Sequence, residues 1–273
     1  RYTKWIGKEI EVDGLLGGFK VRVIGDEAID PEFGTGVAKV TPAHDFNDFE
    51  MAKRHDLEFK TIIDKTGRMT DLTGPYKGIK VKKARELVVQ AMKDKGMIEK
   101  VDENYSHTVA TCYKCGRVLE PLLMPQWYIK VRSLADRAIE AIKKKEVVFT
   151  NKRFEKSALG WLTNFHDWNI SRQIVWGIQI PAYRCRSTDK WFVSVDTPSQ
   201  CVCGKDDFEQ DTDTFDTWFS SGQWPSTTLQ SFGEDLYKDF YPTSVMETGY
   251  DILPWWVCRM LMLGLYRTEK VPF

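Results

Sequence analysis

The feature that most constrains the fold is a nearly unbroken apolar run, "ILPWWVCRMLMLGL", at residues 252–265. A helix that is apolar on all sides must be buried, so this run predicts a core helix with other elements packed around it. The run contains Arg259 and is shorter than the ~18 to 20 residues that a membrane-spanning helix needs, so we expect a soluble protein. Thr248 as N-cap and Asp251 at the third helical position form a capping-box pattern. Pro254 lies in the first turns of this helix, where proline costs less than at mid-helix.

Composition and charge suit a globular chain of about two domains. Of the 273 residues, 42% are hydrophobic and 29% are charged. The 39 basic and 39 acidic residues cancel, so no overall field steers the chain to nucleic acid or to a membrane. We expect no membrane and no DNA among its partners, and infer the partners from local sites instead. Residue 1 is Arg, and the sequence ends soon after the apolar run, so we expect an internal piece of a longer polypeptide.

Residues 8–63 alternate short β-rich runs with glycine turns around a helix at about 46–55, which is typical of a compact α+β unit. The predicted strands are "FKVRVI", "GVAKVTP" and "FKTII", at residues 19–24, 36–42 and 59–63. A further helix is predicted in "VKKARELVVQAMKDKG", with Gly96 as its C-terminal stop. Residues 77–100 hold eight basic and three acidic residues. Two interpretations remain open for this Lys-rich face, a solvated surface or a surface that faces phosphates.

A connector leads from this first region to a second unit. Ser133 followed by Asp136 is a capping-box pattern and predicts a helix start. From about residue 150 a helix leads into a long predicted strand, "IVWGIQIPAY", at residues 174–183. We expect the second unit to begin near residue 150.

The first candidate site is "GTGVAKVTPAHDFNDFEMAKRH", at residues 34–55. Gly34 and Gly36 permit a tight turn, and a helix start is predicted near Asp45. We therefore expect five polar side chains to lie close together at one strand end and one helix N-terminus. They are Lys39, Thr41, His44, Asp45 and Asp48. The acids have two possible roles, to cap the helix or to seat a polar substrate that carries an ammonium group and a phosphate or ribose.

The second candidate site is the cysteine set. Cys112 and Cys115, followed by glycine, have the spacing of a metal knuckle, but such a pair supplies two of the four ligands of a structural zinc site. Cys185, Cys201 and Cys203 offer three more thiols, and Thr188 occupies the position that would complete a C-x-x-C pair with Cys185. The sequence therefore leaves a structural Zn²⁺ open at either place. Tight pairs of this kind suit a reducing cytoplasm better than a disulfide framework. Cys258, in the apolar run, is predicted to be a small core residue.

The third candidate site combines "DTFDTWFSSGQWP", at residues 213–225, with the apolar run. Its tryptophans and Ile252 could line an apolar pocket to which Asp251 presents a carboxylate; the tryptophans are Trp218, Trp224, Trp255 and Trp256. Such a pocket suits a small hydrophobic amino acid, since the acid binds the ammonium and the rings exclude larger side chains. A tryptophan-rich core is the alternative. Asp213 and Asp216 are placed to cap a short helix, and Trp224 before Pro225 is expected to pack.

No Walker A loop, dinucleotide fingerprint, H-E-x-x-H or G-x-S-x-G motif occurs. Long ordered strings instead resemble the class I aminoacyl-tRNA synthetases of the branched-chain group, and most closely the members specific for valine. They are "GTGVAKVTPAHDFNDFEMAKRH", "EPLLMPQWYIKV", "DWNISRQIVWGIQIPAY", "DTFDTWFSSGQWPSTTL" and "FYPTSVMETGYDILPWWVCRMLMLGL". The resemblance covers nearly the whole chain.

The resemblance implies an α/β fold in two parts. The second half of a split Rossmann-type catalytic domain would be joined to part of an inserted, β-rich α+β editing domain. Residues 1–120 would form the C-terminal part of the editing domain, and residues 121–155 the return connection. Residues 156–273 would form the second half of the catalytic domain, with a cysteine-bearing insertion at 185–210.

The resemblance also implies two reactions. ATP, with Mg²⁺, would activate valine as valyl-adenylate, and the valyl group would then pass to the valine tRNA. Asp251 would bind the substrate ammonium, while Ile252, Trp256 and Trp218 would shape the side-chain pocket. Because an apolar pocket rejects threonine poorly, a limit well known for the valine-specific members, a second site would hydrolyse threonyl-tRNA. There Asp48 would hold the ammonium, and Asp45, Lys39 and Thr41 would position the substrate.

The sequence departs from the family pattern in several places. Asn169 stands where cysteine is usual, and Pro254 and Trp255 stand where two phenylalanines are common. The HIGH and KMSKS stretches and the threonine-rich editing peptide are absent, so this chain alone is not expected to aminoacylate. The alternatives are an isoleucyl- or leucyl-tRNA synthetase and a non-catalytic tRNA-binding or zinc-ribbon module.

Overall fold

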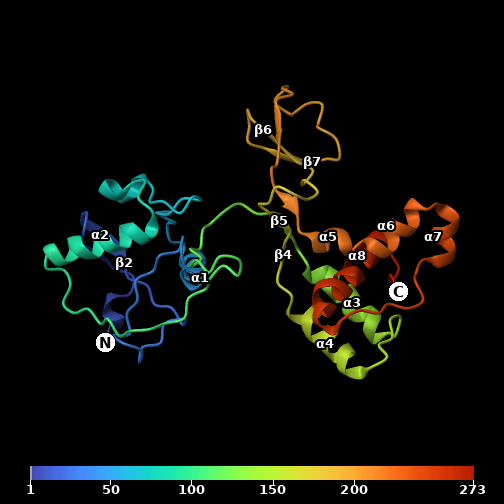
Figure 1. Ribbon diagram of the computed structural model, residues 1–273, viewed down its shortest axis with the longest axis horizontal. Coiled ribbons are helices and arrows are strands. Elements are labelled where there is room, and N and C mark those ends of the chain that lie inside the picture. Colours follow the sequence, from blue (N-terminus) through green and yellow to red (C-terminus); the bar gives the residue numbers. More distant parts are fainter. Residues whose placement is uncertain (1) are drawn as a thin grey trace. The chain divides into compact units, whose positions relative to one another are not determined.

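A computed structural model describes residues 2–273, which form two compact units, one up to Met124 and one from Pro125 (Figure 1). Helices and strands are mixed along the chain, and every strand pairing among the described residues is antiparallel. The parallel sheet typical of a Rossmann fold is therefore not formed within residues 2–273. None of the helices in this range is long and apolar enough to cross a membrane.

The first unit contains one hairpin and two longer helices. Strand β1 pairs with β2, and Gly14 faces Gly17 across the turn. The helices begin and end where short-range signals place them: Asp45 caps α1, and Gly96, with a φ of 65°, follows α2. The elements are η1 (Thr3–Trp5), β1 (Glu9–Gly14), β2 (Gly17–Arg22), α1 (Phe46–His55), η2 (Asp71–Tyr76) and α2 (Val81–Asp94).

Two strands predicted for the first unit, at 36–42 and 59–63, do not form. Side chains satisfy two of their backbone N–H groups, while the Ile62 carbonyl accepts from the N–H of Thr70. The N–H of Thr41 donates to Asp48, and the N–H of Ile62 donates to the ring of His44. Only Ile63 keeps a β-bridge, with Met69. The β-rich composition was therefore misleading here, because strands need a partner edge as well as propensity.

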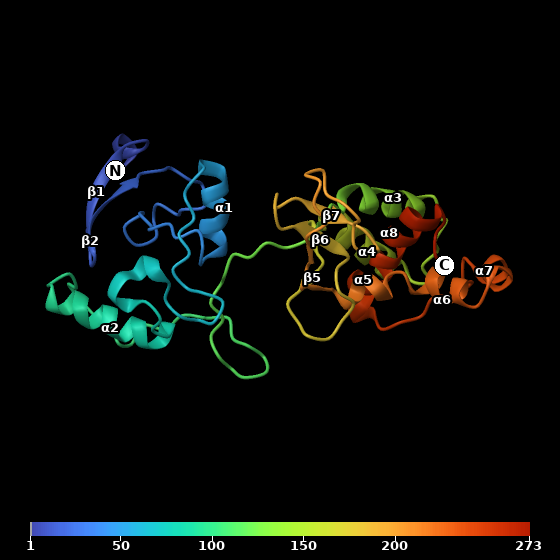
Figure 2. The ribbon, with the colours of Figure 1, turned by 90° about the horizontal axis from the view of Figure 1, so that it is seen from above.

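Three helices form the core of the second unit: α3 (Arg132–Lys143), α4 (Lys152–Asn164) and α8 (Cys258–Thr268). They lie side by side in Figures 1 and 2. Residues Cys258–Leu265 are all buried, which confirms the core helix predicted from the apolar run. On α3 the buried residues are mostly alanines, and these small side chains allow close packing against α8.

Short elements surround this helical core. The remaining helices are α5 (Thr217–Ser221), α6 (Trp224–Ser231), α7 (Glu234–Phe240), η3 (Tyr250–Ile252) and the π-helical turn η4 (Leu253–Val257). Strand β3 (Tyr128–Ile129) pairs with β4 (Trp168–Asn169), and β5 (Ser171–Arg172) pairs with β9 (Thr214–Phe215). A three-stranded sheet has the order β7 (Trp191–Val193), β6 (Ala182–Cys185), β8 (Phe208–Gln210).

The long strand predicted at 174–183 is mostly absent, because only Ala182 and Tyr183 belong to β6. Val175 and Trp176 are almost fully exposed and find no partner strand among the described residues. Helix α3 lies within the segment 121–155 but packs in the core of the second unit. The start of that unit near residue 150 was therefore placed too late.

Both predicted capping boxes are wrong. Gly249 rather than Thr248 precedes the first turn of the apolar segment, and no side chain caps it. Pro254 has no N–H and disfavours a regular α-turn, so the chain passes through a 3₁₀ turn and a π-turn before α8 begins at Cys258. Helix α3 starts after Val131, and Asp136 accepts a hydrogen bond from Arg132 instead of pairing with Ser133.

Candidate functional site

The N-terminus of α1 holds a preorganised carboxylate. Asp45 Oδ1 accepts hydrogen bonds from the N–H groups of Asn47 (2.8 Å) and Asp48 (3.1 Å) and so caps the helix. Asp48 Oδ2 accepts from the N–H and the hydroxyl of Thr41, at 2.6 Å and 3.1 Å. Asp48 Oδ1 accepts no hydrogen bond from residues 2–273. One carboxylate oxygen thus fixes the side chain, while the other is left for a cation or a donor.

His44 fixes the backbone around this carboxylate. Its Nδ1 lies 2.9 Å from the carbonyl oxygen of Pro121, and its Nε2 lies 3.0 Å from the backbone N of Ile62. Since the N–H of Ile62 must donate, Nε2 is the acceptor and Nδ1 carries the proton. The ring therefore links three chain segments at the start of α1.

The structure brings Thr41, Asp45 and Asp48 together with His44, as the sequence predicts. Lys39 is exposed and makes no ion pair with residues 2–273. The predicted tight turn is present: Gly34 and Gly36 have φ of 59° and 72°, and a Cβ on Gly36 would lie 2.7 Å from the Pro31 carbonyl oxygen. A residue with a side chain would disturb that turn.

The second unit contains a buried charge network that the sequence did not reveal. Asp216 is only 4% exposed, and its Oδ2 accepts hydrogen bonds from Trp168 Nε1 (2.9 Å) and Arg259 Nη1 (3.5 Å). The same oxygen forms an ion pair with Arg172 Nη2 (2.8 Å). Asp216 Oδ1 accepts from the N–H of Trp218 and caps α5, which confirms the predicted capping role. Arg259 inside the apolar run was the available signal, since a buried arginine needs a partner.

The four residues predicted to form the amino-acid pocket belong to elements that pack together. Helix α5, which carries Trp218, contacts η4, which carries Trp256. The indole N–H of Trp256 donates to the Ser221 carbonyl at the end of α5 (2.9 Å). Ile252 is half-buried, and Asp251 is exposed in η3. The Ser221 hydroxyl is buried without a hydrogen-bond partner among the described residues.

Two expectations for residues around this pocket, those for Trp224 and Asp213, differ from the structure. Trp224 is 53% exposed rather than packed. Asp213 caps no helix, and its carboxylate accepts from Gln173 Nε2. Trp255 is 42% exposed and contacts Trp161.

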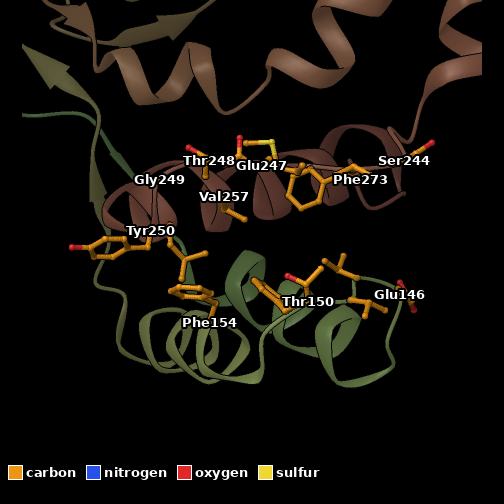
Figure 3. A pocket seen from close by; sticks show the side chains of 16 residues that line it. Glu146, Thr150, Phe154, Ser244, Glu247, Thr248, Gly249, Tyr250, Val257 and Phe273 are labelled. Atoms are coloured by element: carbon orange, nitrogen blue, oxygen red, sulfur yellow. The ribbon is translucent and has the colours of Figure 1, made fainter.

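A cavity of about 710 Å³ lies in the second unit beside η3 and η4 (Figure 3). Val257 and Phe273 line one wall, and Thr150 and Phe154 line the opposite wall. Residues 146–149, 244–250 and Leu253 complete the lining, but Asp251, Ile252, Trp256 and Trp218 do not contribute to it. This cavity could not be predicted from the sequence, because its lining comes from segments about a hundred residues apart.

The three cysteines Cys185, Cys201 and Cys203 converge. Their sulfur atoms lie within 4.8 Å of one another, and Cys185 Sγ is 3.7 Å from Cys203 Sγ. The Thr188 hydroxyl lies 3.6 Å from Cys201 Sγ and also hydrogen-bonds Cys185, so it is beside the cysteine cluster. A hydrogen bond from the Thr188 side chain, helped by other hydrogen bonds and opposed by burial, lowers the pKa of Cys185 to about 6. The donor set fits three of the four ligands of a thiolate zinc site.

Cys112 and Cys115 form a knuckle turn, and no third potential ligand joins them among residues 2–273. The N–H of Gly116 donates to the Cys112 carbonyl, and Gly116 has a φ of 68°. Hydrogen bonds from the backbone N–H groups of Cys115 and Lys114 lower the pKa of Cys112. Among residues 2–273, only Cys185, Cys201 and Cys203 form a group of three potential ligands. Cys258 is fully buried, as predicted, and burial raises its pKa to about 12.

The cysteine cluster allows a direct prediction. Thr188→Cys should raise the affinity of the 273-residue chain for Zn²⁺ about tenfold or more, because a fourth thiolate completes the tetrahedral set. Competition with a chromogenic chelator measures this affinity. Thr217→Cys, on an exposed residue of α5, is the control and should leave the affinity unchanged. Equal affinities of the Thr188→Cys variant and the wild type would mean that Thr188 does not face the metal position.

Comparison with known proteins identifies the class. Residues 41–273 match the family model described as tRNA synthetases class I (I, L, M and V), and the chain belongs to this family. Among similar proteins are the valine–tRNA ligases of Clostridium perfringens (42% identical), Petrotoga mobilis (43%) and Dehalococcoides mccartyi (44%). Each alignment covers 276 positions, all of this chain and 31% of the relative. The chain thus spans about a third of the length of the curated relatives that it matches.

Proposed function

We propose that this chain supplies parts of two sites of a valine–tRNA ligase. The second unit would bind valine for activation by ATP and Mg²⁺, and the first unit would contribute to a site that hydrolyses threonyl-tRNA. The named relatives are valine–tRNA ligases, which favours valine over isoleucine or leucine and favours an enzyme over a non-catalytic zinc or tRNA-binding module. In the complete protein, valine would react with ATP to form valyl-adenylate and then transfer to the valine tRNA.

The main structural support for the proposed valine site is the packing of α5 against η4. The elements that carry Trp218 and Trp256 are in contact, and the hydrogen bond from Trp256 to the Ser221 carbonyl links the two elements. Asp251 lies just before η4 and is accessible to a substrate ammonium. A bound substrate would also provide a partner for the unpaired Ser221 hydroxyl.

Because Gly249 has no side chain, it leaves room for the Asp251 carboxylate. A Cβ on Gly249 would lie 2.6 Å from Asp251 Oδ1, although its φ of −59° suits any residue. A side chain at position 249 would therefore displace the carboxylate without straining the backbone. We infer that Gly249 leaves room for the carboxylate orientation that valine requires.

The proposed roles of the units follow the family pattern. Residues 1–120 would form the C-terminal part of the editing domain, residues 121–155 the return connection, and residues 156–273 the second half of a Rossmann-type domain. Residues 244–249 support this assignment, because they form no strand with any of residues 2–273 and they border the apolar cavity in Figure 3. An unpaired segment of this kind suits pairing with a strand from another part of the protein.

The valine site is tested by Asp251→Asn in the full-length protein. The variant should raise the KM for valine in ATP–pyrophosphate exchange about tenfold or more, because the charge-assisted bond to the ammonium is lost. Gly249→Ala should raise this KM in the same direction, with normal stability. Asp235→Asn, an exposed acid on α7, is the control. An unchanged KM in the Asp251→Asn variant contradicts the pocket, whereas absence of valine-dependent exchange in the wild type contradicts the function itself.

A second candidate function, editing, rests on the free oxygen of Asp48. In the full-length protein, Asp48→Ala should slow deacylation of threonyl-tRNA about tenfold or more, because the substrate ammonium loses its anionic partner. Asp48→Asn keeps an oxygen acceptor for Thr41 but removes the charge, so it separates substrate binding from local structure. If Asp48→Asn deacylates at the wild-type rate, the carboxylate does not hold the ammonium.

A further inference from the structure

A second cavity, about 350 Å³ in volume, lies in the unit that begins at Pro125 and is separate from both proposed sites. Its lining includes Trp161 on α4, Trp168 on β4, Trp255 on η4 and Arg259 on α8. Trp161 and Trp255 contact each other with ring centroids 6.0 Å apart, and both are less than half exposed. The cavity therefore has indole walls, a size suited to a small molecule and one buried cation.

Contacts with two indole rings position the Arg259 guanidinium, but most of its N–H groups have no hydrogen-bond acceptor among the described residues. Its guanidinium lies 4.0 Å from the centroid of the Trp168 ring and 5.3 Å from that of Trp255. Stacking on ring faces leaves the in-plane N–H groups free to donate. Among residues 2–273, its only hydrogen bond is the long one, 3.5 Å, from Nη1 to Asp216. The side chain is 10% exposed, so its remaining donors have little access to bulk water.

Arg259 shares its carboxylate partner, Asp216, with a second arginine, Arg172. Asp216 Oδ2 lies closer to Arg172 Nη2 (2.8 Å) and also accepts from Trp168. The carboxylate of Asp167, which also lines the cavity, is exposed, and its Oδ1 accepts from the N–H of Val131. Two arginines thus share one buried carboxylate. Burial lowers the pKa of Arg259 to about 10, so the guanidinium stays charged at neutral pH.

We propose that this cavity binds a small organic anion that presents a planar carboxylate to Arg259 and an apolar body to Trp161 and Trp255. A carboxylate can accept two parallel N–H bonds from one guanidinium edge. The indole walls suit a flat apolar body, which a hydrated inorganic anion lacks. The single buried cation and the exposed Asp167 carboxylate at the cavity favour a monoanion over phosphate.

Benzoate is a suitable probe, with benzamide as a neutral analogue of the same shape. We expect titration calorimetry and quenching of tryptophan fluorescence to detect benzoate binding to the 273-residue chain. Benzamide and inorganic phosphate should each bind about tenfold more weakly or worse, because the first lacks the charge and the second lacks the apolar body. Equal binding of benzoate and benzamide would overturn the proposal, and so would phosphate binding as tight as that of benzoate. This comparison uses only the wild-type chain, so misfolding of a variant cannot affect its outcome.

Variants locate the site. Arg259→Met should weaken benzoate binding about tenfold or more, Arg259→Lys should weaken it less, and Trp161→Ala should also weaken it. Arg153→Met, which removes an exposed arginine of α4, is the matched control and should bind as the wild type does. Circular dichroism establishes that each variant is folded. Unchanged benzoate binding by a folded Arg259→Met chain would place the anion elsewhere and overturn the proposal.

Discussion

Replacing Asp216 by alanine should lower the free energy of unfolding of the second unit by about 3–5 kcal/mol. The substitution leaves the buried Arg259 and the nearby Arg172 without their carboxylate partner, removes the acceptor for the Trp168 indole N–H, and deletes the N-cap of α5. The cost of uncompensated buried charge dominates, since loss of an N-cap alone costs about 1 kcal/mol. Urea titration followed by tryptophan fluorescence measures the loss, because every tryptophan except Trp5 lies in this unit.

Two further variants separate charge from capping. Asp216→Asn keeps an oxygen that can accept from the Trp218 N–H, so it should retain the cap while still losing the ion pairs. Its destabilisation should fall between that of the alanine variant and the wild type. Asp206→Ala removes an exposed acid in the same unit and should change stability by less than about 0.5 kcal/mol. If Asp216→Ala costs no more than Asp206→Ala, the buried network does not stabilise the fold.

Local signals in the sequence predicted the helices better than the strands. Asp45 starts α1 as predicted, because a capping side chain acts on the nearest N–H groups and needs no distant partner. The apolar run also implied its own burial. The segment 36–42 instead satisfies Thr41 through the Asp48 carboxylate, and propensity cannot reveal such competition. Thr248 and Asp251 failed as a capping box because Pro254 alters the backbone that follows.

Candidate sites were predictable where their residues are close in sequence. Thr41, Asp45 and Asp48 span a single turn and helix start, so their proximity follows from local geometry. Asp216 and Arg259 are far apart in the chain, and their pairing depends on how α5 packs against α8. The sequence offered only the isolated charge in the apolar run. The cluster of Cys185, Cys201 and Cys203 was predictable only in part. Cys201 and Cys203 are close in sequence and meet at the turn at Gly204, whereas Cys185 comes from strand β6.

Leu261→Ala should destabilise the second unit by about 3 kcal/mol, within the usual range of 2–5 kcal/mol for a buried leucine. Leu261 is fully buried in α8, where α3 and α4 pack. The alanines on the buried face of α3 are already small, so the neighbours can fill the resulting cavity only in part. The same urea titration measures this loss. The control is Leu236→Ala, which shortens a leucine that is 42% exposed on α7 and should cost less than about 1 kcal/mol. Equal losses for the two variants would mean that α8 is not the centre of the core.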